Sequence, residues 1–187
     1  MHLKSTGCRR GSAEGQMLEG RALETLLPLA EKAARLLKSR GEKIAVGESS
    51  VGGLVSASLV AQPGASAFFL GSTVIYTREA GRVLRDRSTL TLDGLAPLTP
   101  AFVQAMADGF RKQIGSDWAT SEMGAAGPAG SPYGPQPGTA VVAVSGPVSS
   151  ARLVETGSED RVENMRLFGK AQLELLIECL EKAGVSN

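Results

Sequence analysis

Apolar residues recur at steps of three and four in several parts of the chain, which is the pattern of an amphipathic helix. Residues 18–37 follow it, and Pro28 either kinks this predicted helix or marks its true start. Residues 99–115 follow it as well, opening with Thr-Pro as a cap and first helical residue and closing with glycine. The pattern also predicts a helix that begins at Ser158 and a weaker one over residues 78–86, which contains a glycine.

Short apolar runs between these helices predict strands. Each run is too short for a helix, and most are bounded by turn residues and rich in β-branched or aromatic side chains. The runs cover residues 44–47, 66–77, 117–123, 139–146 and 151–156. Because strands alternate with helices and the last two strands are neighbours, the sequence predicts an α/β fold. We expect a three-layer α/β/α sandwich with a mostly parallel, partly antiparallel (mixed) sheet.

Two unusual loops follow predicted strands. Residues 47–53 carry two adjacent serines and a Gly-Gly pair where a strand leads into a helix. Residues 122–138 are so rich in glycine and proline that most of them must form a loop. Ligands of open α/β sheets bind outside the carboxyl ends of the strands. We therefore expect both loops to contribute to one site.

The residues of these loops allow more than one chemistry. Ser49 or Ser50 is a nucleophile, part of a cradle for phosphate, or simply the cap of the next helix. Tyr76 ends a predicted strand and is either a phenol in the site or an aromatic residue of the core. Arg161 begins a helix, where a cation is disfavoured, which indicates pairing with an anion or with Asp160.

Composition and charge narrow the class of partner. The 187 residues contain 20 lysines and arginines and 19 acidic residues, with no block of like charge. A nucleic-acid-binding surface is therefore not indicated, and no run of eighteen apolar residues predicts a membrane span. We expect a cytoplasmic protein that binds a small ligand rather than nucleic acid or a membrane. Residues 1–16 are small, polar and basic and predict a disordered tail, with a short organellar leader as the alternative.

Histidine and cysteine are too scarce for two common kinds of site. His2 is the one histidine, and Cys8 and Cys179 lie at opposite ends of the chain. These counts argue against a Cys/His zinc site and against a Ser-His-Asp triad, so no metal is expected.

Three stretches together resemble one known family. They are GESSVGGLVSASLVAQPGASAFFLGSTVIYT, GAAGPAG followed by PGTAVVAV, and DRVENM, in order and with compatible spacing. This set resembles the C-terminal domain family of competence/damage-inducible protein A (CinA), and we assign residues 17–187 to such a domain. The resemblance implies a nicotinamide-nucleotide amidohydrolase, which converts nicotinamide mononucleotide (NMN) to the nicotinate form and ammonia. It also implies a homo-oligomer without an organic cofactor.

The resemblance assigns site residues by position. Ser49 stands at the nucleophile position, and Tyr76 stands at that of a tyrosine which helps to activate it. Further residues match positions around the substrate or stand in their place: Glu48, Ser50, Gly52, Gly53, Gly124, Gly127, Gly130 and Arg161.

The chain also departs from the family motifs at positions that matter for chemistry. Gly81 stands where the family has the lysine that activates the serine, and Met123 replaces a serine or threonine near the oxyanion. Arginine cannot replace the lysine as a base, because guanidinium stays protonated in proteins. Glu79 or Glu122 can do so only if the fold brings it within reach.

Three functional hypotheses remain open at the level of sequence. The first is a hydrolase with weak or altered activity on a nicotinamide nucleotide or a related small nucleotide. The second is a catalytically silent protein that binds a nucleotide-like ligand as a sensor or partner subunit. The third, a purely structural interaction module, fits the glycine-rich loop least well.

Overall fold

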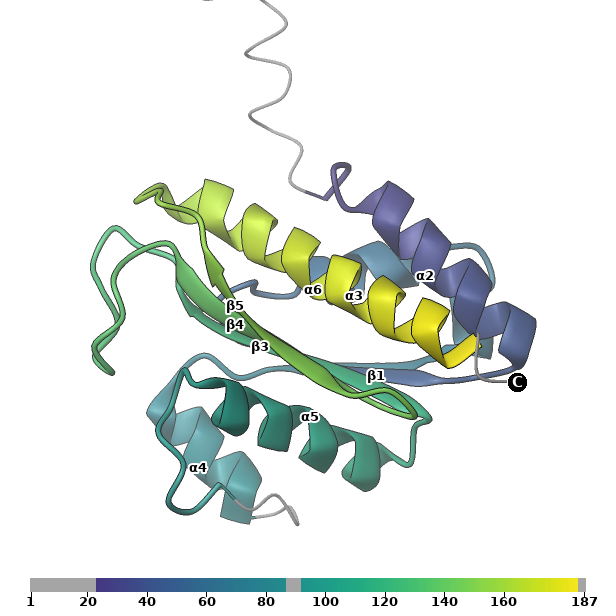
Figure 1. The fold of residues 1–187 in the computed structure, drawn as a ribbon, viewed down its shortest axis with the longest axis horizontal. Helices are drawn as coiled ribbons and strands as arrows, with labels where there is room; N and C mark the ends of the chain where they lie inside the picture. The colour runs from purple at the N-terminus through teal and green to yellow at the C-terminus, as the bar shows by residue number, and fades with distance from the viewer. Residues whose placement is uncertain (1–22, 87–91, 185–187) are drawn as a thin grey trace, which may run out of the picture.

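The computed structural model describes residues 23–86 and 92–184, so the predicted tail at residues 1–16 lies outside the described residues. Five strands form one sheet, and helices cover both of its faces (Figure 1). The strands are β1 (Ile44–Glu48), β2 (Phe69–Val74), β3 (Trp118–Ala125), β4 (Thr139–Ser145) and β5 (Ser150–Glu155). The helices are α2 (Leu27–Arg40), α3 (Leu54–Val60), α4 (Arg78–Asp86), α5 (Pro100–Ile114) and α6 (Arg161–Gly184). None of the described helices is long and apolar enough to span a membrane.

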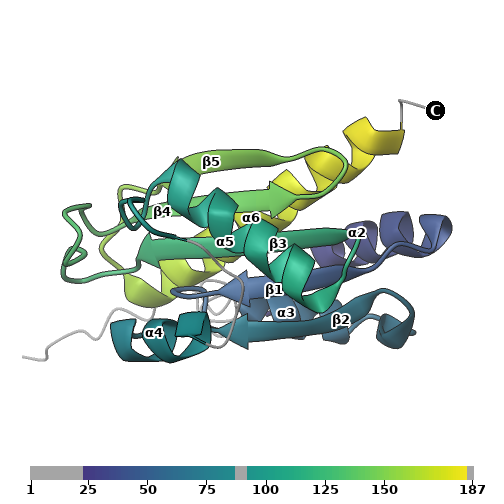
Figure 2. The same ribbon diagram turned by 90° about the horizontal axis from the view of Figure 1, so that it is seen from below.

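The sheet is mixed, as the sequence predicts. Its order is β2-β1-β3-β4-β5, with β1 parallel to both β2 and β3, and with β4 antiparallel to both β3 and β5. Helices α2, α3 and α6 lie on one face, while α5 and α4 lie on the other (Figures 1 and 2). The expected three-layer α/β/α sandwich is confirmed.

The predicted helix starts at Thr99 and Pro28 are confirmed, whereas a serine cap on α3 is wrong and α6 begins at Arg161 rather than at Ser158. The hydroxyl of Thr99 accepts a hydrogen bond from the N–H of Phe102 at 3.3 Å, so this residue caps α5 as its sequence predicts. Pro28 lies in the first turn of α2 and marks its start rather than a kink. No serine caps α3: this helix begins only after Gly53, which adopts a left-handed conformation with φ of 99°. The two serines of the preceding loop are thus left for other roles.

Two apolar cores fill the spaces between the three layers. The larger core packs α2, α3 and α6 on the sheet around Trp118, Phe68 and Phe168, all fully buried. The smaller core packs α5 on the opposite face through Phe102, Phe110 and their neighbours. Side chains of β3 alternate between these two cores because successive residues of a strand point to opposite faces.

The three parallel strands end at the same edge of the sheet, where the chain continues into the two predicted site loops. Gly47, one residue before the end of β1, allows α5 to pack closely here. A Cβ atom at this position would lie 2.5 Å from Cε2 of Phe110 and 2.8 Å from the hydroxyl oxygen of Ser121. The absence of a side chain at residue 47 therefore sets the distance between α5 and the strand that carries the site.

We predict that Gly47→Ala lowers the free energy of unfolding by about 1–3 kcal/mol, because the added methyl group overpacks the contact with Phe110. Urea denaturation measures the effect. Gly81→Ala is the matched control: its Cβ would lie 3.6 Å from the Ile75 side chain, in helix α4, where alanine is favoured. Equal stability of Gly47→Ala and the wild-type protein would show that the close approach of α5 is not a constraint.

Candidate functional site

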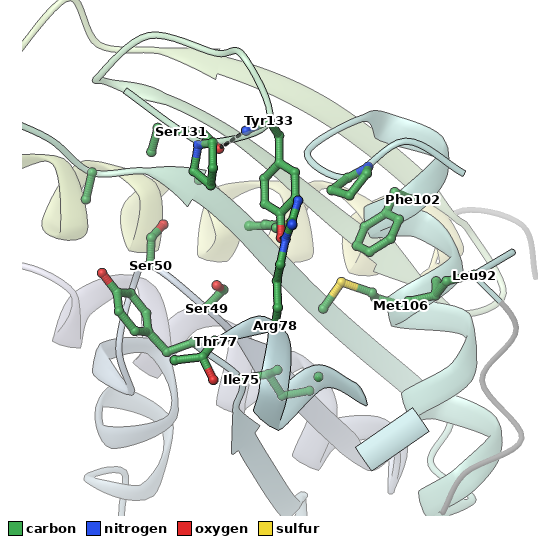
Figure 3. Close-up of a pocket in the computed structure, with 18 of the residues that line it drawn as sticks. Ser49, Ser50, Ile75, Thr77, Arg78, Leu92, Phe102, Met106, Ser131 and Tyr133 are labelled. Carbon is green, nitrogen blue, oxygen red and sulfur yellow. Dashed lines mark hydrogen bonds between the residues drawn. The ribbon is translucent and has the colours of Figure 1, made fainter. Parts of the chain in front are cut away.

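A pocket of about 770 Å³ opens at the edge of the sheet where the parallel strands end (Figure 3). Residues after β1, β2 and β3 line it, together with α5, the first turns of α4 and the start of α6. Both predicted site loops contribute, so the expectation of one shared site agrees with the structure. The pocket lies at the carboxyl ends of the strands, the usual location for a ligand in an open α/β sheet.

The serine loop, residues 49–51, forms the inner end of this pocket and is held from below by Glu122 of β3. The backbone N–H groups of Ser49 and Val51 each donate to Oε2 of Glu122 at 3.1 Å. The hydroxyl of Ser50 makes a short hydrogen bond to Oε1 of the same carboxyl group. One side chain on the central strand thus fixes three consecutive residues of the loop.

Glu122 is fully buried, and this burial changes its acidity. Removal from water raises the pKa of its carboxyl group from 4.5 to about 7, because the charged form loses its hydration. Its hydrogen bonds with Ser50, Val51 and Ser49 lower the pKa, and the nearby carboxyl group of Glu48 raises it. The desolvation effect is the largest, so Glu122 changes protonation near neutral pH.

Glu48 shapes the other side of the serine loop. Its carboxylate accepts hydrogen bonds from the N–H of Gly53 at 2.7 Å and from the N–H of Ser56 at 2.8 Å. The Ser56 hydroxyl makes a further short hydrogen bond to it. Glu48 is completely buried and does not line the pocket. It holds the turn through Gly52 and Gly53, both with positive φ, in place beneath the site.

Two arginine–tyrosine pairs bridge the outer part of the pocket. The phenol oxygen of Tyr76 accepts a hydrogen bond from Arg161 at 2.5 Å, and the same guanidinium donates to the carbonyl of Gly127 at 2.8 Å. Arg78 at the start of α4 donates to the phenol of Tyr133 at 3.0 Å and stacks over its ring at 4.7 Å (Figure 3). Both pairs connect the glycine-rich loop, residues 126–138, to other elements.

The charges of these two arginines are not balanced by carboxylates. Among the described residues, neither Arg78 nor Arg161 takes part in a salt bridge, and the partners of both are neutral phenols and a carbonyl. Guanidinium groups bind phosphate or carboxylate groups through several parallel hydrogen bonds. The outer pocket is therefore suited to the anionic part of a ligand.

One wall of the pocket is apolar. It is formed mainly by α5 and the segment before it, and Figure 3 shows Leu92, Phe102 and Met106 together on this side. Such a wall accommodates a flat ring by burial of apolar surface, while the serines and arginines supply the polar contacts.

The structure brings most of the predicted site residues to this pocket. Those that line it are Ser49, Ser50, Tyr76, Gly124, Gly127, Gly130 and Arg161. Glu48, Gly52 and Gly53 do not line it and instead form the turn below. Tyr76 is bonded to Arg161, and no hydrogen bond joins its phenol to Ser49 among the described residues. Gly81 and Met123, the two departures from the family motifs, also line the pocket.

The roles of Glu122 and of Arg78 and Tyr133 at the outer part of the pocket are not apparent from the sequence. The sequence marks Glu122 only as one possible replacement base, and it marks neither Arg78 nor Tyr133 as a site residue. The available signal was a carboxylate inside an otherwise uncharged strand, WATSEMGA, where burial of a charge requires a specific partner. For Arg78 and Tyr133, 55 residues apart, local pattern offers no signal.

Comparison with known proteins agrees with the fold and the motifs. The model of the CinA C-terminal domain matches residues 26–180. The chain belongs to this family. A CinA-like protein of Prochlorococcus marinus (strain MIT 9313) is 39% identical over 119 residues, which are 64% of this chain and 28% of that protein. One of Chloroherpeton thalassium is 36% identical over 160 residues, 83% of this chain and 38% of that protein.

Solved structures of the CinA superfamily share the fold. A competence-damaged protein (CinA) superfamily protein from Klebsiella pneumoniae 700603 has a TM-score of 0.74 and 27% identity, covering 86% of this chain and 98% of that one. The matched regions span only about a third of the two relatives above. The suspected family resemblance is confirmed, and the domain accounts for part of those longer proteins.

We predict that Glu122 makes the protein less stable as the pH rises from about 4.5 to about 7. In this range the folded state keeps a proton that the unfolded state has already lost, so the free energy of unfolding falls with increasing pH. The loss attributable to this carboxyl group is about 3 kcal/mol. Denaturation of the wild-type protein and of Glu122→Gln at several pH values isolates it. A constant difference between the two proteins across this range would contradict the prediction.

Proposed function

We propose that this CinA-family domain hydrolyses the amide bond of a nicotinamide nucleotide or a related small nucleotide. The observation that carries the proposal is the distribution of groups in the pocket. Two serine hydroxyls lie at its inner end, and two guanidinium groups without carboxylate partners lie farther out. A ligand with an uncharged amide at one end and a phosphate at the other matches this polarity.

The three parts of the pocket fit three parts of such a ligand. The amide lies against Ser49 and Ser50, the ring contacts the apolar wall at Phe102 and Met106, and the phosphate meets Arg78 and Arg161. Each of these contacts is of a kind common in small-ligand sites. We further propose a homo-oligomer without an organic cofactor, as the family resemblance implies, and a cytoplasmic location, as expected from the sequence.

The chemistry is acyl transfer to water through a serine ester. A serine oxygen attacks the amide carbon, the C–N bond breaks, and the nitrogen leaves as ammonia after taking up a proton. Water then hydrolyses the ester to the free acid. A serine hydroxyl is a weak nucleophile, and it needs a neighbouring base to accept its proton.

A second function is favoured by Gly81 and Met123. Both positions line the pocket and lack the polar side chains that the family motif has there. If no other base serves, the protein is a catalytically silent receptor that binds a nucleotide-like ligand as a sensor or partner subunit. The two functions share the ligand and differ in whether it is hydrolysed.

Ammonia release from NMN tests the proposal. We expect slow but measurable release, abolished in the double variant Ser49→Ala/Ser50→Ala, which removes both hydroxyls at the inner end of the pocket. Ligand-induced stabilisation, measured in parallel by thermal unfolding, shows whether NMN binds. Binding without ammonia release would favour the silent receptor, and the absence of both would contradict the nucleotide proposal.

Gly81→Lys should increase the rate of ammonia release, by about 100-fold if the amine acts as a base. The site can accept the side chain, because the nearest atom to a Cβ at residue 81 is 3.6 Å away, on Ile75. Gly81→Met is the matched control, since it supplies similar length without the amine and should give no increase. An equal rise in both variants would point to packing rather than proton transfer.

A further inference from the structure

We propose that Ser50 and Glu122 form a nucleophile and general-base pair, and that Ser50 is the serine that carries the acyl group. This inference rests on the proposed function for its substrate, but its geometry is independent of any substrate. Ser50 is held in the pocket by a short hydrogen bond from its hydroxyl to Oε1 of Glu122. A hydroxyl bonded to a carboxylate is the arrangement that activates a serine.

The neighbouring serine lacks such a partner. No hydrogen bond of the Ser49 hydroxyl is found among the described residues; only its backbone N–H is held, by Oε2 of Glu122 at 3.1 Å. Ser49 and Ser50 both line the pocket, so access to a ligand does not distinguish them. The two serines differ in that only the hydroxyl of Ser50 is hydrogen-bonded to a carboxyl group, and this difference favours Ser50 as the nucleophile.

The surroundings of Glu122 set its proton affinity. On its own face of the sheet, Glu48 at the end of β1 is the charged group that acts on it, and it raises the pKa. Helix α6 presents Asn164, Phe168 and Gln172 to this region, none of which is charged. A carboxyl group with a pKa of about 7 is a stronger base than an ordinary glutamate and is still substantially ionised at neutral pH.

The proton and electron movements balance without a further reactant. As Oγ of Ser50 bonds to the amide carbon, its proton passes to Oε1 of Glu122 and the carbonyl π electrons move to oxygen. When the C–N bond breaks, the nitrogen takes that proton and leaves as ammonia. In the tetrahedral intermediate, the nitrogen and Oγ of Ser50 are attached to the same carbon. The carboxyl group of Glu122, which is hydrogen-bonded to Oγ, is therefore also close to the nitrogen. Water then attacks the carbon of the serine ester and gives a proton to Glu122. The bond to Oγ breaks, Oγ takes that proton, and the free acid is released.

Glu122→Gln separates the chemistry from the structural role of this side chain. Its amide oxygen can accept from the N–H groups of Ser49 and Val51, as Oε2 does now. Its NH₂ group can donate to the hydroxyl of Ser50, as a protonated carboxyl group would. The variant keeps the three contacts of the serine loop but cannot accept a proton.

Diisopropyl fluorophosphate tests the pair without relying on NMN as a substrate. The serine oxygen bonds to phosphorus and fluoride leaves, while the serine proton passes to the base. We expect phosphorylation of Ser50, located by peptide mass mapping, at a rate that rises with pH and is half-maximal near pH 7. Glu122→Gln should slow labelling by about 100-fold or more and remove this pH dependence. Ser50→Ala should abolish it.

Ser121→Ala is the matched control, because Ser121 lies next to Glu122 on β3 but points to the opposite face, toward Phe110. In this variant, Ser50 should be labelled at the wild-type rate. Labelling at Ser49, no labelling of the folded wild-type protein, or an unchanged rate in Glu122→Gln would each overturn the proposal. Labelling of Ser50 without ammonia release from NMN would support the pair and contradict only the proposed substrate.

Discussion

The site depends on one buried carboxyl group, that of Glu122, which holds the loop after β1 against β3. Its three donors lie 71 to 73 residues earlier in the chain. A carboxyl group that loses water on burial must regain hydrogen bonds within the protein, and residues 49–51 provide them. The shape of this loop and the protonation of Glu122 are therefore linked, because Ser50 donates to the ionised group and accepts from the protonated one.

The charged groups of the site lie at two different depths of the pocket. Glu48 and Glu122 lie below the serines and are held by hydrogen bonds from neutral donors, whereas Arg78 and Arg161 lie farther out without carboxylate partners. Both arginine side chains are exposed to solvent, so salt weakens their attraction for an anion. On the function proposed above, these charges orient the ligand so that its phosphate faces outward and its uncharged end approaches the serines.

The sequence predicts the layers, the strand runs and the meeting of the two loops, because periodicity and turn residues report local structure directly. It misplaces the start of α3: Ser49 and Ser50 are good capping residues, but Glu122 and Glu48 use the loop for other hydrogen bonds. The pairing of Arg78 with Tyr133 depends on how the glycine-rich loop folds back over α4, which no local pattern encodes. Tertiary contacts, not propensity, decide these details.

Gly81 and Glu122 both bear on where the serine proton goes. Gly81 removes a basic side chain from the α4 wall of the pocket, and Glu122 places a proton acceptor behind Ser50 on the β3 side. On the mechanism proposed above, the serine proton leaves toward the interior of the sheet instead of toward α4. The base is then shielded from solvent, and the space along α4 that a lysine would occupy is open to the ligand. On this mechanism, the serine has a base although the lysine of the family motif is absent.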